Sequence, residues 1–356
     1  MTRVSKWGVL VDNGLPARVV NQELSDADVV VESVPTDGAG NIALSSSAEA
    51  IRTRYGWDRF VYVTDMPMTA DGDPVAAQVV GEAGDAAIVS LPAFGFRLAR
   101  QNLAERVRAF GQSGQWSGPG RKASPSHVDG ADEHAHATFV TGQRARFVGG
   151  MVRTNRPGRM LTALASCLAV TVATGGFGIF YGSVWQMAHA LSPQRLALVG
   201  GVAVMVLSTW LVIYNGMWHR VSHQTSRQRA RLDNASTGLT VLVTVLMMFA
   251  VTFCGMAALT VVVIPPDYLT EQLGEAVGWR DYVDIAWFTT SLGIMGGALG
   301  SNFDGSAKVR RATFSDRENE RRDSDEEQPS GWREDEHEGS HRTSHAAEGA
   351  SQNQEK

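Results

Sequence analysis

Four apolar runs in the second half of the sequence constrain the fold more than any other feature. Each run is close to the length of about 20 residues that a helix needs to cross the hydrocarbon core of a membrane. None contains Asp, Glu, Lys, Arg or His, while charged segments flank all four. We therefore predict an all-α transmembrane four-helix bundle over residues 151–305, with its spans at about residues 160–182, 196–214, 239–262 and 285–302.

The distribution of Lys and Arg predicts which ends of these helices face the cytoplasm. Cytoplasmic loops of membrane proteins carry an excess of these residues. Two loops contain only Arg195 and Arg280, whereas the opposite side carries twelve basic residues: Arg144, Arg146, Arg153, Arg156, Arg159, Arg220, Arg227, Arg229, Arg231, Lys308, Arg310 and Arg311. The sequence thus predicts a multi-pass protein of the cell membrane, in contact with membrane lipid, with its N-terminus and C-terminus both in the cytoplasm.

Glycines spaced four residues apart occur in the first and the fourth run. This spacing places them on one helix face, where a neighbouring backbone can approach closely. The simplest interpretation is packing within the bundle. The alternative is a homodimer, or a contact with another membrane protein, through the fourth helix. The glycines concerned are Gly178, Gly182, Gly293, Gly296, Gly297 and Gly300.

Residues 1–115 have the pattern of a cytoplasmic α/β domain. Short β-rich runs alternate with stretches of helical periodicity, an order that favours a mostly parallel sheet with helices on its faces. Residues 116–150 are rich in Gly, Ser, Pro and His, and residues 306–356 are acidic and of low complexity. We expect a flexible linker and a disordered cytoplasmic tail there, because neither segment can bury enough apolar surface to fold alone.

Polar residues follow the predicted strands of this domain, in turns that also contain proline. Parallel strands end at the same edge of a sheet, and ligands of such domains bind beyond that edge. These residues are therefore candidates for binding a small molecule of unknown identity. Ordinary turn chemistry is the alternative, since Asp, Asn, Gly and Pro are common turn residues. The candidates are Asp12, Asn13, Asp37, Thr64, Asp65 and Ser90, with Asp65 preferred because it follows the most apolar strand.

Three short segments of this domain carry a resemblance to a known group of proteins. They are Gly56-Trp57-Asp58, Thr64-Asp65-Met66-Pro67 and Ser90-Leu91-Pro92-Ala93-Phe94-Gly95. Together they resemble the GWD…TDLP…SLPA(L/F)G pattern of an uncharacterised family of bacterial membrane proteins. The resemblance implies an N-terminal α/β domain, a C-terminal membrane bundle and a cell-membrane location, but it supplies no catalytic residues.

No pattern in the sequence predicts a metal, a cofactor or a nucleic-acid partner. His219 and His223 are four residues apart without a third ligand nearby, and Cys167 and Cys254 lie inside apolar runs. A glycine-rich loop at residues 38–43 precedes its helix by too many residues for a dinucleotide site. The net charge is −5, with acidic and basic segments kept apart, which does not indicate a surface for nucleic acid.

Three classes of function fit these features. We favour a membrane-anchored module that senses a ligand or binds a partner through its cytoplasmic domain. The alternatives are a membrane-bound enzyme with a pocket at the strand ends, and a transporter or transporter subunit. Ion and proton pathways usually require ionisable groups inside the membrane, and the four apolar runs lack them.

Overall fold

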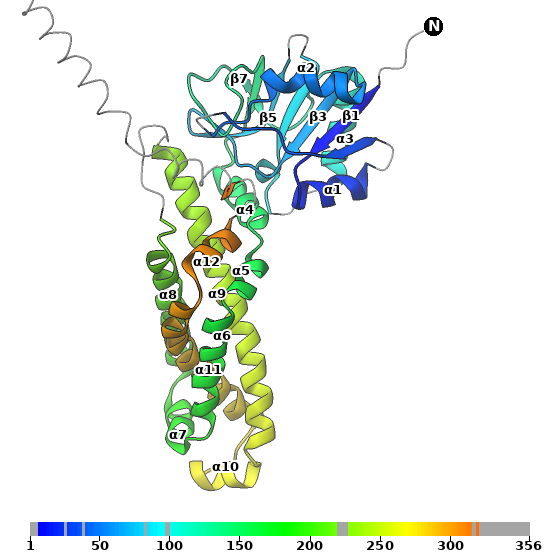
Figure 1. Ribbon diagram of the computed structural model, residues 1–356. Helices are drawn as coiled ribbons and strands as arrows, with labels where there is room; N and C mark the ends of the chain where they lie inside the picture. The colour runs from blue at the N-terminus through cyan, green and yellow to red at the C-terminus, as the bar shows by residue number, and fades with distance from the viewer. Residues whose placement is uncertain are drawn as a thin grey trace, which may run out of the picture.

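An α/β domain lies at one end of an elongated bundle of helices (Figure 1). The computed structural model describes residues 6–24, 27–37, 40–81, 84–96, 100–218, 227–314, 318 and 319. The histidine pair His219 and His223, and the tail from residue 320 onward, lie outside the described residues.

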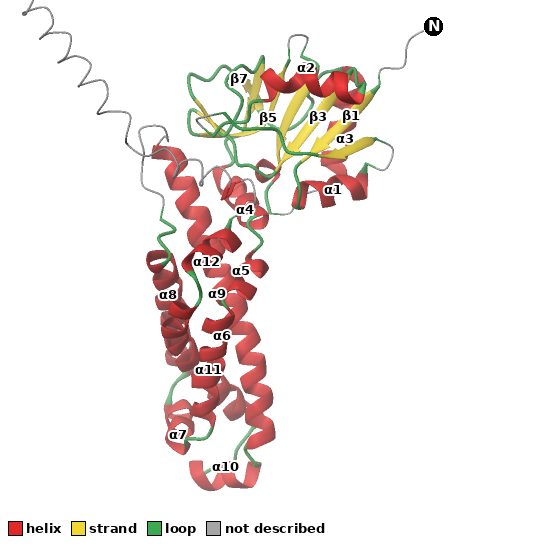
Figure 2. Ribbon diagram, viewed as in Figure 1, coloured by secondary structure: helices red, strands yellow, loops and turns green. Residues whose placement is uncertain are grey.

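Nine strands among the described residues form one mixed sheet, which lies at the centre of the domain (Figure 2). Its parallel half has the order β2 (Asp28–Val31), β1 (Trp7–Val11), β3 (Arg59–Thr64), β6 (Ala86–Ser90). Its antiparallel half comprises β5 (Asp73–Val80), β4 (Thr69–Ala70), β8 (Val128–Asp129), β9 (Ala137–Val140) and β7 (Arg121–Ala123). The predicted α/β domain with parallel strands is thus confirmed, although the sheet is mixed.

Helices cover both faces of the sheet, so the central strands are apolar on both sides. Consecutive residues of β3 show the two layers. Val61 packs in one core cluster with α1 (Leu15–Glu23) and α3 (Arg100–Ser113). Tyr62 packs in another with α2 (Leu44–Tyr55).

The segment expected to be a flexible linker is part of the folded domain, and that prediction was wrong. Residues 121–140 supply β7, β8 and β9, and Trp116 and Val140 are buried. The buried side chain of Gln78 fixes the segment to β5: its Nε2 donates to the Asp132 carbonyl at 3.0 Å, and its Oε1 accepts from the Asp132 N–H at 2.7 Å. Strands this short need only a few buried residues, so the polar composition of the segment gave no sign of them.

The helical part begins inside the same segment. Its elements are α4 (Arg144–Thr154), α5 (Pro157–Ala163), α6 (Ala165–Ile179), α7 (Gly182–Ala190), α8 (Pro193–Tyr214), α9 (Arg227–Val263), α10 (Pro266–Leu273), α11 (Trp279–Gly300), the 3₁₀ turn η2 (Ser301–Phe303) and α12 (Ser306–Thr313). Helix α11 contacts α6, α8 and α9. The start of the predicted disordered tail is therefore ordered as α12.

By length and composition, α8 and α9 are the helices able to cross a membrane among the described residues, and α5 with α6 would be a third, bent by 72°. The bend lies where the sequence predicted one continuous span. Asp304 explains the restart of the helix, because its carboxylate accepts the N–H groups of Ser166 and Cys167 at 3.0 and 2.9 Å. Two membrane-compatible helices are thus confirmed, and the fourth predicted span, α11, is not among them.

The glycines of α11 face α6. A Cβ atom at Gly293 would lie 2.5 Å from the Thr171 carbonyl, and one at Gly297 would lie 2.1 Å from the Thr171 hydroxyl. Gly296 and Gly300 likewise meet Thr174 and Val170. On α6, Gly178 meets Thr289 of α11, whereas Gly182 lies near Gln272 of α10. This is the packing within the bundle that the spacing indicated, and it occupies the face that the homodimer alternative would use.

Candidate functional site

The carboxyl edge of the parallel strands brings four of the six candidate residues together. Asp12 follows β1, Thr64 and Asp65 end and follow β3, and Ser90 ends β6. These three strands are neighbours in the sheet, in the order β1, β3, β6. We call the edge formed by Asp12, Thr64, Asp65 and Ser90 the strand-end rim.

Two hydroxyl groups of the rim hold its own backbone. The Thr64 hydroxyl accepts the N–H of Met66 at 3.0 Å, and the Ser90 hydroxyl donates to the Met66 carbonyl at 2.9 Å. Both side chains are fully buried. Thr64 and Ser90 thus fix the turn from residue 64 to 67, which is the turn chemistry that the sequence left open as an alternative.

The two rim carboxylates are buried as well. Asp12 is inaccessible to solvent, and its Oδ1 accepts a hydrogen bond of 2.5 Å from the hydroxyl of Tyr62. Asp65 is only 3% exposed. Sequence reasoning missed Tyr62, because the residue stands inside an apolar strand and gives no polar signal.

Asn13 and Asp37 are exposed, in contrast to the rim. The Asp37 carboxylate accepts the N–H of Asn41 at 2.8 Å, and Thr36 forms a β-bridge with Ile42. Asp37 therefore closes a local turn of its own.

Helix α4 covers the rim from the side of the bundle. A Cβ atom at Gly150 would lie 2.0 Å from the Pro92 carbonyl, in the 3₁₀ turn η1 (Leu91–Phe94) that follows β6. Arg146 and Arg153 donate to the carbonyls of Phe94 and Phe96 at 3.2 and 2.8 Å. The basic residues that the sequence assigned to a membrane flank therefore also contact the domain.

Arg156 lies beside the loop that follows β1. Its Nη2 lies 2.6 Å from the position that a Cβ atom of Gly14 would occupy. Gly14 has a φ of 100°, a conformation that favours glycine. The absence of a side chain at this position therefore gives the guanidinium room beside the loop after β1.

The first turns of α9 also contact the turn beside the strand-end rim. Arg229 is fully buried, and its Nη1 donates to the carbonyl of Pro67 at 2.7 Å. Its Nε forms a buried ion pair with Asp233, one turn further along α9, at 3.0 Å. A cavity of about 10 Å³, room for about one water, lies beside Pro67 and Asp233. In the described part of the chain, the turns beside the strand-end rim thus form a joint between the domain and the bundle.

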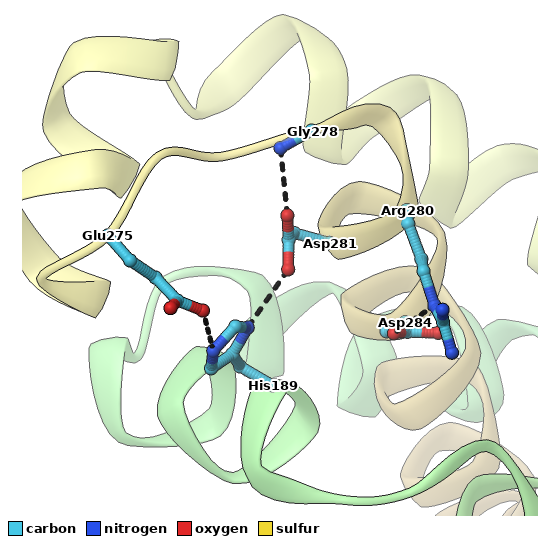
Figure 3. Close-up of polar contacts among 6 residues, drawn as sticks. All are labelled: His189, Glu275, Gly278, Arg280, Asp281 and Asp284. Carbon is cyan, nitrogen blue, oxygen red and sulfur yellow. Dashed lines mark hydrogen bonds and ion pairs between the residues drawn. The ribbon is translucent and has the colours of Figure 1, made fainter.

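A second polar cluster lies at the opposite end of the bundle. His189 of α7 stands between two carboxylates: its Nε2 is 2.6 Å from Glu275 and its Nδ1 is 2.9 Å from Asp281 (Figure 3). Asp281 also accepts the N–H of Gly278 at 2.8 Å, at the start of α11. We call His189, Glu275 and Asp281 the far-end cluster. It ties α7 to the connection between α10 and α11.

The surroundings set the pKa values in this cluster. The hydrogen bond with Asp281 raises the pKa of His189 above its ordinary value of 6.5, against a smaller opposing effect of burial, and the charge of Glu275 adds to the rise. Burial would raise the pKa of Asp281, but the hydrogen bonds from Gly278 and His189 lower it. Burial raises the pKa of Asp284, although Arg280 is close by. A protonated His189 can donate to both of its carboxylate partners at once.

An open polar hollow of about 410 Å³ lies on the segment from β7 to β9. That volume is in the usual range for small-molecule sites, about 300–1,000 Å³. Its lining includes Ser126, His127, Asp132, Glu133 and His136. Asp132 is held by the backbone N–H groups of Ser45 and His134, at 2.7 and 2.8 Å. The hollow is a second place where the domain could receive a small polar molecule, and no group of three metal-ligating residues occurs in the described part of the chain.

In comparisons with protein-family models, with curated proteins and with solved structures, the chain matches none of them.

Proposed function

We propose that the chain is a multi-pass protein of the cell membrane in which a cytoplasmic α/β domain senses a ligand or a partner and is mechanically coupled to the membrane-spanning helices. The proposal has two parts, the membrane topology and the coupling, and different observations support them.

The surface of the helical bundle supports the membrane location. Large apolar side chains point outward from its helices, among them Leu198, Ile213, Val262 and Leu299. Hydroxyl-bearing residues such as Thr240 and Thr289 are fully buried inside. By contrast, the described part of the α/β domain exposes only Val31 and Phe96 among its large apolar side chains. A broad apolar surface of this kind would be unstable in water but is suited to lipid.

The surroundings of α11 support its role as a fourth span. This helix is less apolar because its polar residues face other helices: Thr289, Thr290 and Ser291 are buried, and each donates to a carbonyl of its own helix. With α5 and α6 as one bent span, α8, α9 and α11 bring the number to four. An even number keeps both chain ends on one side, in agreement with the distribution of basic residues.

The contact that carries the coupling is the hydrogen bond from Arg229 to Pro67. Pro67 belongs to the turn of the rim, and ligands of parallel sheets bind at this edge. Arg229 belongs to α9, which runs on through the bundle. Removing one partner of a buried ion pair such as Arg229–Asp233 typically costs about 3–5 kcal/mol. Because this pair holds the Arg229 side chain in place, a molecule that shifts the turn of the rim would act on α9 through the contact between Arg229 and Pro67.

The experiment begins with the full-length protein in mild detergent and mass spectrometry of the small molecules and proteins that co-purify with it. The identified molecule is then added back, and hydrogen exchange is measured. We expect slower exchange both in the α/β domain and in the first turns of α9. In Arg229→Gln the domain should still respond while α9 should not, and Arg231→Gln, an exposed neighbour on the same helix, should behave as the unchanged protein.

Two results would contradict the proposal. If α9 in the unchanged protein does not respond to the added molecule, the domain is not coupled to the bundle. If the molecule is converted to a product, the enzyme alternative is correct.

A further inference from the structure

A basic groove lies between α5 and α12, at the side of the bundle that carries the α/β domain. Its volume is about 490 Å³, and its lining includes three cationic residues, Arg159, Lys308 and Arg311. The remaining lining residues are Thr162 and the small residues Ala163, Ala307 and Ala312, so no acidic residue is among them. The lining of the groove therefore combines three positively charged residues with small, mainly apolar ones.

The sequence of α12 explains how the groove forms. Val309 and Thr313, four residues apart, are buried against the bundle. That contact turns Lys308 and Arg311, which are three residues apart, toward the solvent side. On α5, Arg159, Thr162 and Ala163 follow the same helical spacing and line the other wall. Among the described residues, the carboxylate nearest along the chain, that of Asp304, is buried and accepts hydrogen bonds from the start of α6, so it does not line the groove.

The groove lies at the depth expected for lipid headgroups, if the proposed topology holds. Trp210 donates from its indole N–H to the hydroxyl of Ser301 at 3.1 Å, five residues before α12 begins. Trp210 stacks on Tyr214 and both are exposed, as is usual for aromatic residues at a membrane interface. The aromatic pair thus lies where a membrane interface is expected, and the groove follows on its cytoplasmic side.

We propose that this groove binds the phosphate-bearing headgroup of an anionic phospholipid from the cytoplasmic leaflet. The inference rests on the proposed membrane topology and adds a ligand to it. Basic pockets beside spanning helices on this side are suited to anionic headgroups. Lys308 and Arg311 supply the charge that a phosphate needs, and the alanines leave room for the glycerol part of the lipid. Since α12 and α5 come from the two ends of the helical region, a bound lipid would also join them.

The test compares two double variants of the full-length protein in detergent. Lys308→Gln with Arg311→Gln removes two charges from the groove. Arg227→Gln with Arg231→Gln removes two exposed charges from the same side of the bundle but outside the groove. Native mass spectrometry measures binding of phosphatidylglycerol, with phosphatidylcholine and inorganic phosphate as comparison ligands.

We expect the unchanged protein and the Arg227/Arg231 variant to bind phosphatidylglycerol alike and in preference to phosphatidylcholine. The Lys308/Arg311 variant should bind it about thirtyfold more weakly, because each of the two basic residues near an anionic lipid contributes about 1 kcal/mol. Equal weakening in both double variants would overturn the site, and so would displacement of the lipid by inorganic phosphate at equal concentration. Extraction of the unchanged protein from membranes by alkaline carbonate is a separate measurement: release would reject the membrane topology itself.

Discussion

Arg229 and His189 each join elements that are far apart in the sequence. Arg229 contacts Pro67, 162 residues earlier in the chain, and His189 contacts Asp281, 92 residues later. They lie at opposite ends of the bundle, one buried and one partly exposed. Each of them thus contributes a long-range contact at one end of the bundle.

Protonation of His189 should strengthen the far-end cluster. Its pKa in the folded protein is raised, so its stabilising contribution is fully present below the ordinary pKa of about 6.5 and is lost as the pH rises through the raised value. Asp281, whose pKa is lowered, stays ionised throughout this window. We therefore expect the Tm difference between the unchanged protein and His189→Gln to be largest in mild acid and to shrink as the pH rises.

His136→Gln provides the matched control, because His136 is exposed on the α/β domain. Its Tm difference from the unchanged protein should not vary in the same way over this pH window. A pH-independent difference for His189→Gln would show that the cluster is held by neutral hydrogen bonds instead.

The sequence identified some of the polar residues of the strand-end rim but not the contacts that these residues make. It placed six residues at one edge, and four of them, Asp12, Thr64, Asp65 and Ser90, meet there because the ends of parallel strands follow from the strand pattern, whereas Asp37 closes a separate turn. It could not show that Thr64 and Ser90 bond to Met66, since that depends on turn geometry. Arg229 was counted only as a basic residue at a membrane flank, because burial of a charge leaves no local sequence signal.

Among the elements, α11 depends on glycine at its contact with α6. In Gly293→Ala, the new Cβ atom would meet the backbone carbonyl of Thr171 at 2.5 Å, and a backbone atom cannot move away cheaply. We expect a loss of about 1–3 kcal/mol, as in other overpacked cores, measured as a lower Tm in detergent. Gly176→Ala on α6 is the control, because a Cβ atom there meets nothing within 4 Å.

The homodimer alternative makes a different prediction for the same pair of variants. If α11 packs on a second copy through its glycines, Gly293→Ala should reduce cross-linked dimer without lowering the Tm of the monomer. That outcome would contradict the packing described above.

The elements β7, β8 and β9 determine where the α/β domain ends. A fragment of residues 1–115 lacks β9, which pairs with β5, and β8, which pairs with β4, so we expect it to aggregate. A fragment of residues 1–155 includes them together with α4, whose Phe147 and Met151 pack on Ala76 and Ala93. It should be soluble with a cooperative thermal transition by circular dichroism. Equal folding of both fragments would mean that the sheet is stable without its antiparallel edge.

These three strands also show the limit of pattern reading. The longer apolar strands β1, β3 and β6 are predictable because both faces are covered, which leaves a run of buried residues. Strands β7, β8 and β9 have three, two and four residues. Strands this short contain too few residues to show the alternation of apolar and polar residues that marks a strand. Their pairing is determined by contacts such as that of Gln78 with Asp132.

For the whole molecule, topology is the property to test first. A reporter fused at the N-terminus or after Asn302 should be active only in its cytoplasmic form. One inserted near Ser192 or Leu273 should report the opposite side, because these residues lie in the loops with few basic residues. Opposite-side activity for a fusion after Asn302 would remove α11 as a span, and a cytoplasmic signal from Leu273 would reject the four-span arrangement.

Helix α9 has 37 residues, and at about 1.5 Å per residue it is about 55 Å long. A bilayer core occupies only about 30 Å of that length, so a long rigid arm projects toward the α/β domain with Arg229 at its tip. Pivoting the whole helix by about 5° at its end next to α10 would move the opposite end by about 5 Å, roughly one helical turn. A small tilt of α9 would therefore be large enough to break the hydrogen bond between Arg229 and Pro67.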